Sequence, residues 1–302
     1  WDMLERGYTM HHAISQDKQG NILATVSKTS AKIANGKDVR INDFIIRMDP
    51  EKGEILQEWD LVNMLDSARY GMTDYNLTAD PYAQNASNWA HNNGIVEWGN
   101  DYLATARYQG IFKFNKAGGI EWIISPHGYW RDRYLKLLLN PLHADGTPIT
   151  DPDVIAGTKN CDDFEWPWGC HTAVPLPNGH IFYFNNGYGR NFKLDFTDRK
   201  NVYTCGIEYE VDEVNRTVRQ VWQYGKERGT AYFTPARSGV QYLEQTGNRL
   251  ICPGMSNVLS NGNRGARVTE VDPETQEIVF ELELEDAIYQ RVYRMSLYPD
   301  NQ

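Results

Sequence analysis

Four segments of the 302-residue chain repeat one template, and this repeat limits the fold more than any other feature of the sequence. In each segment an anchor residue stands eight positions before a turn glycine, and an apolar stretch follows the glycine. The four anchors and their glycines are His12 with Gly20, His91 with Gly99, His171 with Gly179, and Gly239 with Gly247. A strand, a polar turn with glycine and a second strand are typical of a β-hairpin.

A second hairpin is predicted after each of these segments. The second hairpins cover residues 43–61, 110–125, 206–225 and 266–284. Their turns, DPEKG, NKAGG, DEVN and DPET, are dense in residues that favour turns. Two successive hairpins make a four-stranded antiparallel module, and modules in series are typical of β-propeller blades. The sequence therefore predicts an all-β fold, a β-propeller with about four visible blades.

The whole chain, residues 1–302, is predicted to form a single β-propeller domain. The spacing of the anchors exceeds a minimal blade of ~40–50 residues. The excess lies in two insertions, near residues 62–88 and 127–160, which are expected to decorate one face of the disc. The chain starts just before the first inner strand, so these blades are expected to belong to a larger ring.

Composition and charge argue against several classes of binding partner. The net charge is −10 and no basic run stands out, so nucleic-acid binding is not expected. No apolar run is long enough to span a bilayer, so no membrane partner is expected. The four cysteines form no CxxC pair, so no metal site is predicted. Cys161 and Cys170 lie close in the sequence and predict a short-loop disulfide, with two free thiols as the alternative.

Three of the seven histidines occupy the same template position in successive modules. Equivalent positions on the first strand of propeller blades face the central channel, so three imidazoles are expected to converge there. The alternative is a histidine that stabilises each repeat without a function of its own. Polar residues beside the anchors favour a functional site. They are His11, Asn92, Asn93, Arg107 and Thr172.

Two kinds of chemistry fit three imidazoles. They could ligate a metal, so a His-ligated metalloenzyme is one hypothesis. However, no Asp or Glu occupies the anchor position of any repeat. Arg107 lies on the second strand of the hairpin that begins at His91. A guanidinium beside imidazoles favours a tetrahedral oxyanion, sulfate or phosphate. In such a pocket one imidazole can act as nucleophile, another can protonate a leaving phenolate, and Arg107 can stabilise the developing charge.

Residues 10–21, 88–114 and 164–190 resemble the bacterial arylsulfate sulfotransferase family. The stretches that carry the resemblance are MHHAISQDKQGN, NWAHNNGIVEWGNDYLATARYQGIFKF and FEWPWGCHTAVPLPNGHIFYFNNGYGR. The resemblance implies a periplasmic six-bladed propeller that uses no nucleotide sulfate donor and no cofactor. It implies ping-pong transfer from an aryl sulfate to a phenol through a sulfohistidine, so the partners are small phenolic sulfate donors and phenol acceptors.

The resemblance also implies roles for individual residues. By position, His171 looks like the nucleophile, and His12, His91, Asn93 and Arg107 look like the group that binds the sulfuryl moiety and transfers protons. The family has a short-loop disulfide before the nucleophile, which Cys161 and Cys170 could match. The resemblance implies a periplasmic or secreted location, and it leaves open whether the protein forms a homodimer.

Several side chains have two interpretations. His11, Thr172, Ser238 and Tyr293 are expected to reach the channel and contact substrate, or else to be ordinary strand residues. Trp89, Trp166 and Trp168 either line an aromatic mouth or pack in the core. His127, His143 and His180 lie outside the repeated position and are expected on the surface or in loops. A propeller that binds partners without catalysis is the remaining alternative.

Overall fold

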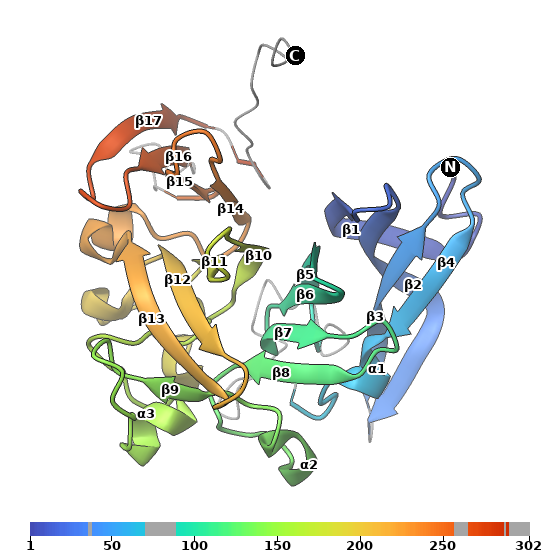
Figure 1. Cartoon of the computed structure of the whole chain (residues 1–302), viewed down its shortest axis with the longest axis horizontal. Coiled ribbons are helices and arrows are strands. Elements are labelled where there is room, and N and C mark those ends of the chain that lie inside the picture. The colour runs from blue at the N-terminus through green and yellow to red at the C-terminus, as the bar shows by residue number, and fades with distance from the viewer. Residues whose placement is uncertain (36–37, 70–88, 257–264, 287, 290–302) are drawn as a thin grey trace.

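The computed structural model describes residues 1–35, 38–69, 89–256, 265–286 and 288–289, and these residues form four antiparallel sheets (Figure 1). The all-β prediction is confirmed, because the helices within this part of the chain are only three to six residues long. In each sheet the four main strands are neighbours in chain order, which is the arrangement expected of two successive hairpins.

The strands follow the predicted hairpins. The first sheet contains β1 (Tyr8–Gln16), β2 (Ile22–Asn35), β3 (Asp38–Met48) and β4 (Ile55–Asp60). The second contains β5 (Asn92–Trp98), β6 (Asp101–Ala106), β7 (Gly110–Phe114) and β8 (Ile120–Ile124). The third contains β10 (His171–Pro175), β11 (Ile181–Asn185), β12 (Cys205–Asp212) and β13 (Thr217–Tyr224). The fourth contains β14 (Ser238–Tyr242), β15 (Arg249–Pro253), β16 (Ala266–Val271) and β17 (Ile278–Leu284).

Short helical elements lie between the strands. They are α1 (Leu61–Met64), α2 (Asp132–Leu135), α3 (Pro152–Ala156), η2 (Arg190–Phe192), η3 (Arg199–Asn201) and η4 (Lys226–Ala231). Residues 127–160 contain α2, α3 and the strand β9 (Asn140–Leu142), which pairs in parallel with β13 and adds a fifth strand to the third sheet. Of the other expected insertion, only residues 62–69 are described. Among the described residues, no helix has the length and apolarity that a membrane span requires.

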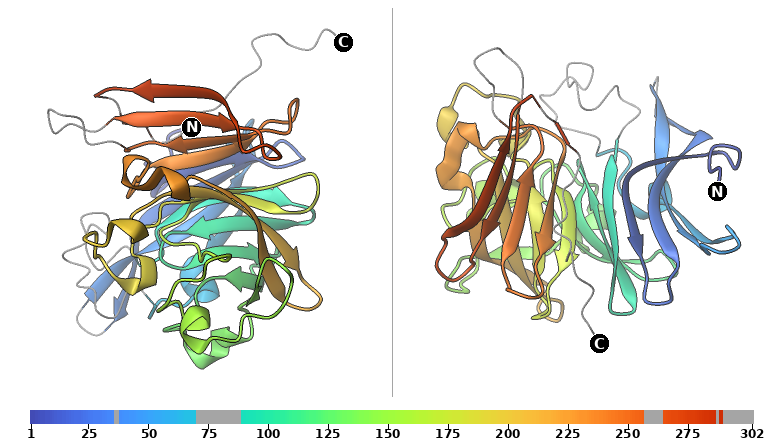
Figure 2. Two further views of the ribbon diagram at one scale, coloured as in Figure 1. Left: turned by 90° about the vertical axis from the view of Figure 1, so that its left-hand side faces the viewer. Right: turned by 90° about the horizontal axis from the view of Figure 1, so that it is seen from above.

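The first strands of the four sheets lie toward the middle of the molecule, and the later strands lie outward (Figures 1 and 2). Strand β1 contacts β5, β5 contacts β10, and β10 contacts β14. The sheets therefore follow one another side by side, with their first strands gathered together. This arrangement brings together the anchor histidines, which lie inside β1, just before β5 and at the start of β10.

Apolar side chains from neighbouring sheets fill the space between them. Trp59 and Ile45 of the first sheet pack with Tyr102 and Phe112 of the second. Between the second and third sheets, large aromatic side chains from the chain segment before β10 join the core, among them Trp166 and Trp168. Trp89 is fully buried as well. The three tryptophans with two interpretations are thus core residues, and they do not line an open mouth.

The turn of the second sheet differs from the others. The pair Trp98–Asp101 closes a two-residue loop, whereas the pairs Gln16–Ile22 and Pro175–Ile181 close five-residue loops. Residues that stand eight positions before the turn glycine therefore do not occupy the same place in the strand pairing of every sheet. His91 lies just before the first residue of β5, while His12 lies inside β1 and His171 is the first residue of β10.

Candidate active site

The strand ends that carry the anchor histidines are irregular. The pairing register shifts between Met10 and Ile14, between Asn92 and Gly94, and between His171 and Ala173. His12 and Thr172 lie within these shifts and His91 lies just before one, and their φ angles are 53°, 27° and 52°. A non-glycine residue in this region costs of order 1–3 kcal/mol, and such strain gathers at functional sites. The irregularities turn side chains out of the normal alternation of a strand.

The imidazoles of His11, His12 and His91 form a continuous chain of contacts. Nδ1 of His11 lies 3.0 Å from Nδ1 of His12, and Nε2 of His12 lies 3.1 Å from Nε2 of His91. The ring centroid of His171 is 6.1 Å from that of His12. The structure therefore brings the rings of His12, His91 and His171 close together, as the repeat predicted. A neutral imidazole has one donor and one acceptor nitrogen, so His12 can accept a proton at one nitrogen and pass one on at the other.

A buried carboxyl group ends this chain of imidazoles. Oδ1 of Asp43 lies 3.7 Å from Nε2 of His11, and Oδ2 of Asp43 accepts the backbone N–H of Asn92 at 3.0 Å. Burial raises the pKa of Asp43, although His11 and hydrogen bonds oppose the rise. Burial lowers the pKa of His11, with Asp43 opposing the fall. Asp43, on β3, was not among the residues that the sequence predicted.

An asparagine orients the imidazole of His171. Oδ1 of Asn186 lies 2.6 Å from Nδ1 of His171, and both side chains are buried. The Asn186 amide nitrogen donates to the Thr234 carbonyl at 2.8 Å and to Oγ of Ser238 at 3.2 Å. These two bonds fix the amide so that its oxygen faces His171. Nδ1 of His171 therefore carries the proton, and Nε2 carries the lone pair.

Arg107 lies beside this cluster. Its backbone N–H donates to the His91 carbonyl at 3.0 Å, and its Nη2 donates to the Pro235 carbonyl at 2.7 Å. The guanidinium lies over the Tyr188 ring, 4.6 Å from its centroid. Burial lowers the pKa of His91 well below its ordinary value, and the nearby positive charges of His12, Arg107 and His171 lower it further. His91 is therefore a neutral imidazole near neutral pH.

The residues expected to bind substrate lie in different places. Asn93 is buried, with Nδ2 donating to the Cys170 carbonyl at 2.8 Å and Oδ1 accepting from Thr105 at 2.7 Å, so it fixes the backbone just before His171. Ser238 is buried against Asn186. Thr172 follows His171 and lines a cavity. Tyr293 lies outside the described residues.

The predicted disulfide between Cys161 and Cys170 is wrong for this structure, in which both thiols are free. The two sulfurs have different surroundings. Sγ of Cys170 is buried 3.9 Å from the Ala106 carbonyl, and burial raises its pKa to about 12. Sγ of Cys161 is half-buried and donates to Asp163 at 3.1 Å. Nearness in sequence did not bring the thiols together, because the tryptophan-rich segment between them enters the core.

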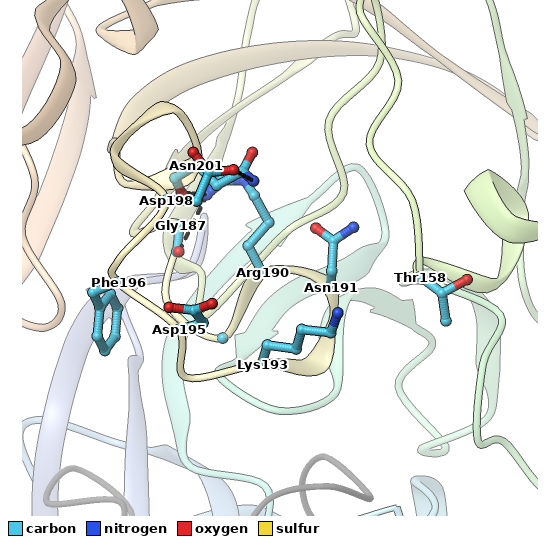
Figure 3. Close-up of a pocket in the computed structure, with 10 residues that line it drawn as sticks. Thr158, Gly187, Arg190, Asn191, Lys193, Asp195, Phe196, Asp198 and Asn201 are labelled. Atoms are coloured by element: carbon cyan, nitrogen blue, oxygen red, sulfur yellow. Dashed lines mark hydrogen bonds between the residues drawn. The ribbon is translucent and has the colours of Figure 1, made fainter.

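Two cavities in the described part of the structure bear on where a substrate could bind. One, of about 470 Å³, is lined by the first strands of all four sheets and includes Thr172, the residue after His171. Its walls are mostly apolar and include Ile14, Ile95, Val174 and Val240. The other, of about 210 Å³, lies in the loop after β11 (Figure 3). It combines Lys193 with Asp195 and Asp198, and its Arg190 is already paired with Glu165 at 2.7 Å, so it is not a cationic pocket.

Two curated relatives carry the name arylsulfate sulfotransferase AssT. They come from Escherichia coli O6:H1 and Lelliottia amnigena, and each is 28% identical to this chain over 99% of its length and 54% of the relative's. The chain thus spans about half the length of these relatives. A solved structure of a candidate 6-phosphogluconolactonase from Bacteroides uniformis aligns with a TM-score of 0.38 and 12% identity, over 95% of this chain and 77% of that one. That likeness is too low to carry an argument.

The family model described as Arylsulfotransferase (ASST) matches residues 2–294. The resemblance predicted from the three histidine-containing stretches is therefore confirmed. Since the match extends over almost the whole sequence, the chain belongs to the arylsulfotransferase family.

Proposed function

We propose that the protein transfers a sulfuryl group from an aryl sulfate to a phenol through a covalent intermediate on His171. The observation that carries this proposal is the oriented imidazole of His171 in a cluster with His12, His91 and Arg107. Membership of the arylsulfotransferase family and the names of the two relatives support it. We also propose that the four side-by-side sheets are blades of a propeller, and that the protein is periplasmic or secreted.

In the first half-reaction, the lone pair on Nε2 of His171 attacks the sulfur of the aryl sulfate. The N–S bond forms while the S–O bond to the aryl group breaks, and the aryl oxygen leaves with the electron pair. The transition state resembles phosphoryl transfer, with negative charge on the three remaining oxygens. Arg107 stabilises that charge, because its guanidinium is fixed beside the cluster before the reaction begins.

The chain of imidazoles accounts for the protons. A leaving phenolate takes a proton from the chain formed by His91, His12 and His11. In the second half-reaction, the acceptor phenol gives its proton to this chain as its oxygen attacks sulfur. The N–S bond then breaks and returns the electron pair to His171, so the enzyme is regenerated and the product is a new aryl sulfate. Asp43, next to His11 at the far end of the chain, partly offsets the fall in the His11 pKa that burial causes.

The apolar cavity next to Thr172 suits an aromatic ring. Its lining includes Thr172, the residue after His171, and several aliphatic side chains, so burial of a phenyl group against them is favourable. This position would hold the ring of the donor or of the acceptor while the sulfuryl group faces the histidines. The chemistry needs no metal, and a fixed guanidinium beside the imidazoles disfavours a dication at that position.

The experiment is a turnover assay with 4-nitrophenyl sulfate and phenol, in which release of nitrophenolate is followed by absorbance. The parent protein is expected to release nitrophenolate only slowly without phenol and repeatedly with it. His171→Asn is expected to lower the rate at least about a thousandfold, because the nucleophile is gone. His180→Asn, which changes a histidine outside the cluster, is the control and should leave the rate unchanged. Equal rates for the two variants would overturn the assignment of His171.

A further inference from the structure

Two loops outside the histidine cluster meet and bring three metal-ligating side chains together. His143 follows β9, and Cys161 and Asp163 lie in the segment that leads to β10. One donor atom from each of these residues lies within 4.8 Å of the other two. No sequence motif joins these residues, so only the fold reveals the cluster.

The backbone around the cluster is well fixed. The His143 N–H donates to the Thr147 carbonyl at 2.8 Å, and the His143 carbonyl accepts from Gly146 at 2.9 Å, which closes a tight turn. The Ala144 N–H donates to Oδ2 of Asp163 at 2.9 Å and ties this turn to the second loop. The ligating groups are therefore held in place before any ion arrives, which lowers the entropic cost of binding one.

The spacing of the three donor atoms suits a small cation. Nδ1 of His143 lies 3.0 Å from Oδ1 of Asp163, and Sγ of Cys161 lies 3.1 Å from the same oxygen. Zinc bonds of about 2.0–2.3 Å place neighbouring ligand atoms roughly 3–4 Å apart. The cluster thus needs only small side-chain rotations to surround an ion.

The donor set and its exposure indicate which ion would bind. A thiolate, an imidazole and a carboxylate together favour a borderline-soft divalent metal over Mg²⁺ or Ca²⁺, which prefer oxygen ligands alone. All three residues are half-buried, so an ion can reach them from solvent. One guanidinium beside this turn, that of Arg219, donates to the Ala144 carbonyl at 3.0 Å but is paired with Glu210 at 2.6 Å, which compensates its charge.

We propose that His143, Cys161 and Asp163 form a zinc site, with Nδ1, Sγ and a carboxylate oxygen as ligands and water in the fourth position. On binding, the Cys161 thiol gives its proton to solvent, and the proton on Nδ1 of His143 moves through solvent to Nε2 of the same ring, which leaves a lone pair on Nδ1. The contacts of Asp163 with Cys161 and His143 are then replaced by bonds to the ion. The ion would fasten the turn after β9 to the segment that leads into His171. This inference is independent of the proposed sulfuryl transfer.

The test uses Co²⁺ alone, added to the full chain after treatment with a chelator and its removal. Tetrahedral Co²⁺ with a thiolate ligand gives a sulfur-to-metal absorption band in the near ultraviolet. The parent protein is expected to show this band at one equivalent of Co²⁺ and to lose it when Zn²⁺ is added. Cys161→Ser is expected to lack the band, and His143→Gln to bind Co²⁺ at least about tenfold more weakly, since one of three ligands is missing.

His180→Gln is the matched control, because His180 also pairs with a carboxylate, Glu208 at 2.6 Å, but has no cysteine in that pair. It should keep the band and the affinity of the parent. Circular dichroism of each variant verifies the fold, and His143→Gln decides the question if Cys161→Ser does not fold. The proposal is overturned if the parent shows no band, if the band persists in Cys161→Ser, or if His143→Gln binds like the parent.

Discussion

Two residues that matter most for the histidine cluster were outside the repeated template. Asn186 follows β11, and Asp43 lies on β3. The repeat identified first-strand residues because one position recurs in each module, whereas these partners occur once and reach the site from other strands. The sequence did hold a signal for Asn186. The apolar run of β11 ends in two asparagines, although a strand that is buried on both faces is expected to continue with apolar residues.

Asn186 offers a sharp test of how the cluster works. In Asn186→Leu, the hydrogen bond to Nδ1 of His171 is lost, so the tautomer with its lone pair on Nε2 is no longer favoured. We expect kcat to fall about 10–100-fold, the range found when a partner that orients a metal-ligating histidine is removed, with little change in KM. Steady-state release of nitrophenolate measures both constants.

The control for this prediction is Asn178→Leu, which changes an exposed asparagine beside His180. Its kcat should match that of the parent. A variant at Asn186 with normal kcat and raised KM would show that Asn186 contacts substrate and does not orient His171.

At the scale of elements, the hairpins were predictable because their turns are dense in glycine, asparagine, aspartate and proline. The register was less predictable. The turn at Gly99 and Asn100 has only two residues, so the loop between β5 and β6 is shorter than the one between β1 and β2. His91 and His12 are equivalent in the repeated template, but they therefore differ in their place in the strand pairing. Left-handed backbone at both histidines compensates and brings the rings together. Strand β9 was missed as well, because three residues in a long insertion give no periodic pattern.

A buried ion pair joins two of the segments that surround His171. Nη2 of Arg190 lies 2.7 Å from Oε1 of Glu165, and both side chains are about 95% buried, with exposures of 4% and 5%. In Glu165→Leu, the guanidinium would stay buried without its partner. We expect the free energy of unfolding to fall by about 3–5 kcal/mol, measured by urea denaturation.

The exposed pair of Lys159 and Asp151, at 2.7 Å, provides the comparison for this prediction. Lys159→Ala should leave the free energy of unfolding close to that of the parent, because water screens the pair. Similar losses in the two variants would contradict the view that the buried pair anchors the loop.

For the whole molecule, the histidine cluster links stability to pH. Because the folded-state pKa of His91 is well below about 6.5, its value in the unfolded chain, the unfolded chain binds a proton first as the pH falls. The stability that neutral His91 contributes is therefore complete above about pH 6.5 and is lost as the pH falls below it, by up to about 1.4 kcal/mol per unit.

We expect His91→Gln to reduce the slope of unfolding free energy against pH between about pH 6.5 and 5, measured by denaturation at a series of pH values. Above about pH 7.5 the parent and the variant should have parallel curves, which serves as the internal control. An unchanged slope in the variant below pH 6.5 would contradict a buried, neutral His91.

The whole account depends on one covalent bond between His171 and sulfur. Its most direct test is to mix the protein with 4-nitrophenyl sulfate without a phenol, quench the mixture at alkaline pH and map the peptides by mass spectrometry. The account predicts one sulfuryl group on the peptide that contains His171, which disappears when phenol is added before the quench. A sulfuryl group on another residue, or none while nitrophenolate is being released with phenol present, would contradict it.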